Sequence, residues 1–166
     1  MLHRINLMKE LLGSLDPDLM QFLKDCEIGE LVFCHKWLLL GFQREFPYDD
    51  GLRLLEILSS HHLELYTPQG IAVREHCRRF LKNESGGTEY AVDFEFSSDF
   101  TFDLFVAVGI LNIFRNRIYQ CLDGSQVFQF INSLSGKLSL DDVLKRAETL
   151  FYRYCQKSVT DAFILL

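Results

Sequence analysis

Histidines are the first residues to consider for chemistry, because imidazole nitrogens are common ligands for zinc. His61 and His62 are adjacent, and His76 follows in the next stretch of chain. Adjacent residues point to different faces of a helix, and no cysteine or carboxylate set stands beside them at metal-ligand spacing. We therefore interpret them as surface or helix-end residues and expect no bound metal.

Patterns for nucleophilic catalysis and nucleotide binding are equally sparse. Cys34 and His35 are neighbours in sequence, but a nucleophile and its base must meet in space, and no third member is evident. Gly86, Gly87 and Gly109 form neither a phosphate-binding loop nor a dinucleotide fingerprint. The sequence thus predicts no cofactor and no enzyme. An enzyme with a new site would need a metal at the histidines.

Composition favours one soluble domain. The 166 residues are 48% apolar and 13% aromatic, which is enough for a single packed core. A net charge of -6 with dispersed Lys and Arg argues against nucleic acid and anionic membranes as partners. Neither a signal peptide nor a transmembrane segment is evident, and the five cysteines form no CxxC pair. We expect a cytoplasmic protein with reduced cysteines.

The elements around these residues are predicted to be helices, so the fold class is all-α. Three amphipathic helices are indicated by apolar residues at helical spacing: from Ile5 to Leu15, from Val127 to Leu134, and over about 140–155. The N-cap signal of Asp16-Pro17 predicts a further helix over 17–25, and Ser139 supplies a cap for the helix over 140–155. Two segments that are apolar on nearly every face, Leu31 to Phe42 and Phe102 to Cys121, predict buried central helices.

Pro47, Asp49 and Asp50 open a further helix, in which we expect Leu52, Leu55 and Leu58 to point inward and Asp49 to pair with Arg53.

The region 61–99 interrupts this rhythm and is interpreted as an insertion within one domain over 1–155. It contains a possible helix from Ile71 to Leu81, an exposed loop at 83–87 and a strand-like stretch from Tyr90 to Phe96. Residues 156–166 are expected to form a tail. Asp161 to Leu166 formally matches an acidic dileucine sorting signal, and a frayed apolar tail is the alternative.

One segment, from Phe33 to Phe46, carries a family resemblance. It resembles the third signature block of the TBC-domain family of Rab GTPase-activating proteins: Phe-x-x-Arg-Trp, several leucines, Phe-x-Arg-Glu-Phe, then Arg-Leu-Trp-Glu. Lys36 replaces the first arginine of that pattern, and Leu55 replaces its second tryptophan. The matching residues are Phe33, Lys36, Trp37, Phe42, Arg44, Glu45, Phe46, Arg53 and Glu56.

The resemblance implies the C-terminal helical subdomain of a TBC domain, with a Rab-type small GTPase as partner and a role in vesicle trafficking. Members of that family use an arginine from Ile-x-x-Asp-x-x-Arg and a glutamine from Tyr-x-Gln-Gly, both before the third block. Tyr66 to Gly70 only echoes the second motif, and 32 residues before Phe33 leave no room for the two.

We therefore expect a truncated form or fragment, weak or inactive as an activator, cytoplasmic or peripheral on vesicle membranes through partners. The alternative is a non-catalytic helical adaptor that binds a Rab or another protein. Apolar faces that the missing half would cover predict self-association.

Overall fold

The computed structural model describes residues 2–61, 63–84 and 100–164. Within these ranges the chain forms helices joined by turns and contains no strand, so the predicted all-α fold is confirmed. The strand-like stretch from Tyr90 to Phe96 and the glycines at 86 and 87 lie outside the described residues.

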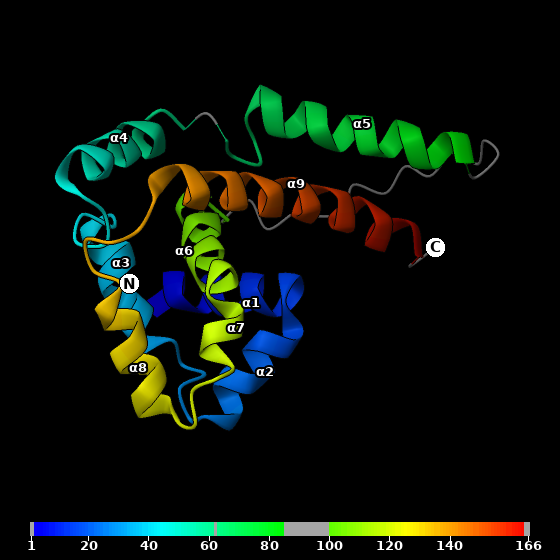
Figure 1. The fold of residues 1–166 in the computed structure, drawn as a ribbon. Helices are drawn as coiled ribbons and strands as arrows, with labels where there is room; N and C mark the ends of the chain where they lie inside the picture. Colours follow the sequence, from blue (N-terminus) through cyan, green and yellow to red (C-terminus); the bar gives the residue numbers. More distant parts are fainter. Residues whose placement is uncertain (1, 62, 85–99, 165–166) are drawn as a thin grey trace.

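The core is built around α6 (Phe102–Ile113), whose side chains from Leu104 to Leu111 are all buried. It packs most extensively against α9 (Leu140–Ile164), which crosses it as Figure 1 shows. The crossing is close because Gly109 has no side chain: a Cβ there would lie 3.4 Å from the backbone nitrogen of Ala147. Phe105 and Phe151 meet edge to face beside it, with ring centroids 5.3 Å apart. The predicted central helix is therefore present.

That central helix is shorter than the sequence suggested. The backbone leaves the helical region at Phe114, and a short helix α7 (Arg115–Ile118) follows. Phe114 is half-buried and packs its ring on Phe130, at a centroid distance of 5.7 Å. The continuous apolar pattern concealed this break, because periodicity does not reveal a single residue with non-helical dihedral angles.

Two helices at the N-terminus extend this core: α1 (Leu2–Leu15) packs against α6, and α2 (Pro17–Asp25) packs against α1. The Asp16 carboxylate accepts a hydrogen bond from the backbone N–H of Leu19 at 3.2 Å, and Pro17 occupies the first helical position. The predicted helix over 17–25 is confirmed with its cap.

The buried helix predicted from Leu31 to Phe42 is wrong in its extent. A 3-10 turn η1 (Val32–Cys34) leads into α3 (His35–Leu40), and left-handed backbone at Leu31 and Phe42 bounds the pair. Leu39 is 62% exposed, and Val32 and Leu40 are also exposed. Short elements of this kind bury one side only.

The remaining helices are α4 (Tyr48–Ser59), α5 (Pro68–Glu84) and α8 (Gly124–Ser133). Within the region expected to be an insertion, α5 is longer than the predicted 71–81 and lies along α9 (Figure 1). The last helix, α9, continues to Ile164, beyond position 155 where a tail was expected.

Candidate functional site

The four aromatic residues of the signature segment are buried. Phe33, Trp37, Phe42 and Phe46 are each at most 4% exposed, and the rings of Trp37 and Phe42 lie 6.4 Å apart between centroids. These side chains fix the segment to the core, so the polar residues between them are held at defined positions.

Polar contacts then tie the segment to the end of α8 and to the chain that connects it to α9. Lys36 Nζ donates to the side-chain oxygen of Asn132. The backbone oxygen of Arg44 accepts hydrogen bonds from Ser135 Oγ at 2.7 Å and Gly136 N at 2.9 Å. The next carbonyl, that of Glu45, accepts from Leu138 N at 3.3 Å. These partners follow one another in the same order in both stretches, which joins residues 36–45 to 132–138 along their length.

Glu45 is the charged residue that this arrangement buries, with only 2% of its surface exposed. Burial raises the pKa of its carboxyl, while the nearby charges of Lys36 and Arg44 act in the opposite direction. Glu45 Oε2 and Trp37 Nε1 lie near each other but make no hydrogen bond of good geometry within the described structure. The cost of burying this carboxylate is therefore offset mainly by the positive charges of Lys36 and Arg44.

The last two signature residues, Arg53 and Glu56, are exposed on α4. Arg53 pairs with Asp141 across the surface, at 3.1 Å between Nη1 and Oδ1, and not with Asp49 as predicted. Leu52 and Leu55, expected to point inward, are 43% and 40% exposed, whereas Leu54 is fully buried. The helix is rotated relative to the prediction because Gly51 and Leu54 face the core.

A second polar cluster joins α2 to the end of α6. Asp16 is 7% exposed, and its Oδ2 accepts from Asn112 Nδ2 at 3.1 Å and lies 3.2 Å from Arg115 Nε. Arg115 also lies over the ring of Tyr119, 5.2 Å from its centroid. Because Asp16 caps α2 and pairs with Arg115 at once, this cluster is structural.

The residues considered first for chemistry do not converge. His61 and His76 are exposed and lie in different segments, and His62 lies outside the described residues. Cys34 is buried, which raises the pKa of its thiol well above its ordinary value, while His35 is exposed. No group of three or more His, Cys, Asp or Glu side chains suited to a metal ion is found among the residues that the structure describes.

A site that the sequence reasoning missed lies in the turn after α4. Glu64 is 3% exposed, and its Oε1 lies 3.7 Å from Nδ1 of His61. Burial raises the pKa of the Glu64 carboxyl, against the opposing influence of the Phe102 backbone N–H and of His61. The signal in the sequence is slight: a glutamate between two leucines, Leu63 and Leu65.

No helix in the described ranges has the length and apolar character needed to span a membrane.

Comparison with known proteins shows which domain family the signature segment matches. The model of the Rab-GTPase-TBC domain matches residues 1–81, which include the whole block from Phe33 to Glu56. Human TBC1 domain family member 17 is 35% identical over 141 residues, covering 84% of this chain and 16% of that protein. The GTPase-activating protein GYP7 of Saccharomyces cerevisiae is 30% identical over 146 residues, covering 87% of this chain and 15% of its own length.

The chain thus spans about a sixth of the length of these relatives. The matches nevertheless extend over the signature segment and the helices that hold it in place. The chain belongs to the Rab-GTPase-TBC domain family.

Proposed function

We propose that this chain binds a Rab-type small GTPase as part of a TBC domain and does not itself strongly accelerate GTP hydrolysis. The proposal rests on the structure of the signature segment. Its aromatic residues are buried, and its backbone carbonyls accept hydrogen bonds from the stretch 132–138. The match of the family model to residues 1–81 and the name of the yeast relative, a GTPase-activating protein, support a regulator of GTPases.

Weak activation follows from the residues that catalysis requires. Members of the family supply an arginine and a glutamine to the nucleotide, and an arginine finger is worth about a thousand- to a hundred-thousandfold in rate. The sequence contains neither of the two motifs that carry these residues. Of the signature arginines, Arg53 is paired with Asp141, and Arg44 is exposed. Gln43 directly precedes Arg44, but it does not stand in the Tyr-x-Gln-Gly pattern that the family uses.

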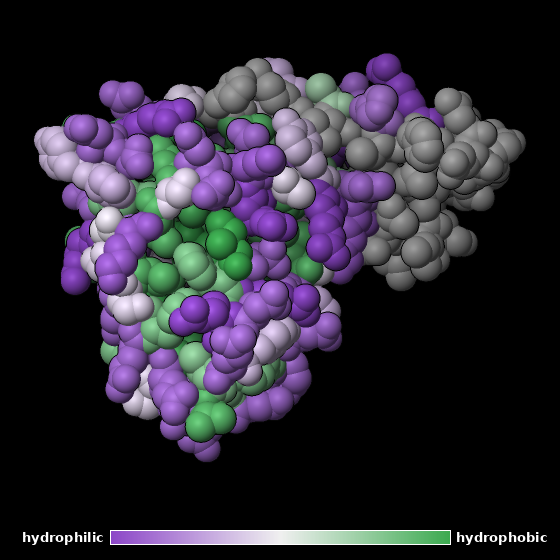
Figure 2. Space-filling view, in the orientation of Figure 1, coloured by the Kyte–Doolittle hydropathy of each residue, from purple (hydrophilic) through white to green (hydrophobic). Residues whose placement is uncertain are grey.

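A second candidate function, a non-catalytic adaptor, is favoured by the exposed apolar side chains. Figure 2 shows apolar residues gathered on the face between α9 and α8, within a largely polar surface. Several apolar residues of the signature region and of α4 and α8 are exposed: Val32, Leu39, Leu40, Leu52, Leu55 and Phe128. Such surface favours a protein partner or self-association. Either role is compatible with a cytoplasmic chain that reaches vesicle membranes through its partners.

Binding to a panel of Rab proteins, each loaded with GTP or GDP, tests the proposal by biolayer interferometry. We expect saturable binding to at least one GTP-loaded member and weaker binding to its GDP-loaded form. Absence of measurable binding across the panel would contradict the proposal.

Two exposed leucines offer a matched pair for locating the contact. Leu39→Ser changes the signature region, and Leu122→Ser changes a leucine that is 85% exposed in the loop before α8. We expect only the first to weaken binding. Light scattering tests for self-association. A molar mass of 19.4 kDa, that of one chain, at every concentration would exclude it.

A further inference from the structure

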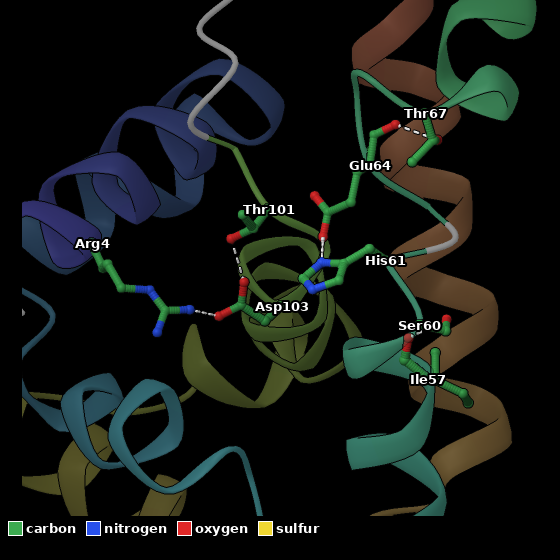
Figure 3. Close-up of polar contacts among 8 residues, drawn as sticks. All are labelled: Arg4, Ile57, Ser60, His61, Glu64, Thr67, Thr101 and Asp103. Carbon is green, nitrogen blue, oxygen red and sulfur yellow. Dashed lines mark hydrogen bonds and ion pairs between the residues drawn. The ribbon is translucent and has the colours of Figure 1, made fainter.

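A hollow of about 360 Å³ lies where the turn after α4 meets α1 and the start of α6. Figure 3 shows that Arg4, Asp103 and Thr101 face His61 and Glu64 from a different part of the fold. Its apolar wall is formed by Leu38, Phe42 and Leu58. The hollow is therefore amphipathic, because both polar and apolar side chains line it.

The buried polar group in this hollow is the Glu64 carboxylate, whose Oε2 has no hydrogen-bond partner within the described structure. The backbone holds it in place. Thr67 Oγ1 donates to the Glu64 carbonyl at 2.7 Å, and a Cβ at Gly70 would lie only 2.3 Å from the same oxygen. A buried acceptor without a donor costs about 1–3 kcal/mol, so this geometry favours a ligand that brings N–H groups.

The charges of the residues that line the hollow also favour a ligand that brings N–H groups. Arg4 is already paired with Asp103 and also donates to the backbone oxygen of Leu38 at 3.4 Å. An adjoining hollow of about 250 Å³ is lined by Glu64, His61 and Glu148. Among the described residues, the first hollow is lined by one permanent cation, Arg4, and two carboxylates, Asp103 and Glu64, and the adjoining hollow adds Glu148. The other basic side chain that the structure describes in these linings is the His61 imidazole. The excess negative charge favours a cation.

We propose that this hollow binds the basic side chain of an arginine or lysine in a polypeptide, whose N–H groups donate to Glu64. The methylene stem of such a side chain would lie against Leu38, Phe42 and Leu58. A side chain fits better than a free amino acid, because Arg4 is paired with Asp103 and no other described residue of this lining is a permanent cation that could bind an α-carboxylate. Binding of a basic side chain at this hollow does not require that the chain also bind a GTPase.

The test is an NMR titration of the full 15N-labelled chain with N-acetyl-L-arginine methylamide at pH 7.5. Saturable shifts are expected for amides of residues 63–70 and 101–104, and none with the norleucine analogue, which has the stem without the charge. Glu64→Gln should weaken binding at least about tenfold, since each tenfold step is 1.4 kcal/mol. Glu10→Gln, an exposed site with the same charge change, should leave binding unaltered.

The pH dependence of binding is an independent test that needs no variant. Binding should weaken between pH 7.5 and pH 5, because burial raises the pKa of Glu64 and protonation of its carboxylate removes the negative charge that attracts the cation. Among the residues that the structure describes, Arg4, Asp103 and Glu148 are the other charged groups that line these hollows.

Three results would overturn the proposal. Shifts that do not saturate, or that persist unchanged in Glu64→Gln, would show that the Glu64 carboxylate does not bind the ligand. Tighter binding of free arginine than of its blocked form would assign an amino-acid site. Identical shifts on adding magnesium chloride alone would assign a metal.

Discussion

Two glutamates of this chain are buried to nearly the same degree, and they differ in what surrounds them. Glu45 is 2% exposed and Glu64 is 3% exposed, each has an Oε2 without a hydrogen-bond partner in the described structure, and burial raises the pKa of both. Beside Glu45 lie the permanent charges of Lys36 and Arg44. Beside Glu64 lie a titratable imidazole and one backbone N–H.

The difference separates a structural glutamate from one available to a ligand. The carbonyl of Glu45 is docked on Leu138, and its neighbours Trp37 and Phe46 are buried in the core. Glu64 instead borders open space. A buried carboxylate is therefore a weak indication of a site by itself, and the neighbouring cations and free volume decide its role.

The largest expected effect tests whether the region around Glu45 is structural. Trp37→Ala removes a fully buried indole and should lower the free energy of unfolding by about 3–5 kcal/mol, enough to unfold a marginal domain. Leu39→Ala, on the same helix but 62% exposed, should change it by less than about 0.5 kcal/mol. Urea denaturation measures both. Equal effects would mean that α3 does not pack as described.

The next effect concerns the turn that carries Glu64. Gly70→Ala places a Cβ 2.3 Å from the Glu64 carbonyl oxygen and should cost about 1–3 kcal/mol of stability through overpacking. Gly13→Ala in α1 meets nothing within 4 Å and should be neutral or stabilise by up to about 1 kcal/mol. If urea denaturation gives Gly70→Ala the wild-type stability, the turn is looser than the structure shows.

Double-mutant cycles compare the two glutamates directly. Lys36→Met with Glu45→Gln should show a coupling of about 1 kcal/mol at pH 7.5, because a permanent cation offsets a buried carboxylate. His61→Ala with Glu64→Gln should show less than about 0.5 kcal/mol, because the two side chains are 3.7 Å apart and the imidazole is 65% exposed to solvent. A reversed order of the two couplings would exchange the roles assigned to the two residues.

The smallest effect is a pH dependence. Because the pKa of Glu64 is raised, the folded chain holds that proton more tightly than the unfolded chain, so stability falls as pH rises from 4.5 through the raised value. Glu64→Gln lacks this loss and should become more stable than wild type by up to about 1 kcal/mol at pH 7.5. Denaturation at pH 4 and pH 7.5 checks it. A constant difference between the two proteins would show that this carboxyl does not titrate abnormally.

The sequence predicted elements whose signals are local. Asp16-Pro17 specified the start of α2, and the uniformly apolar run in α6 correctly indicated a central helix, because cap chemistry and all-round burial act within one segment. The signature resemblance predicted the family.

Other features depend on contacts between distant segments and were not predictable. The segment from Leu31 to Phe42 was read as one buried helix, but left-handed residues at both ends break it and expose Leu39. Arg53 pairs with Asp141, 88 positions away, and not with Asp49. Glu64 is buried where the turn after α4 meets the start of α6, so its two flanking leucines are only a slight local signal.

The most direct test of the functional proposal is single-turnover GTP hydrolysis on a panel of GTP-loaded Rab proteins, with and without this chain. A chain that binds a Rab without an arginine finger should change the rate by less than about twofold. Acceleration of about a hundredfold or more, roughly 2.7 kcal/mol of barrier, would contradict the proposal. It would also require a substitute arginine, with Arg44 and Arg53 the first to replace.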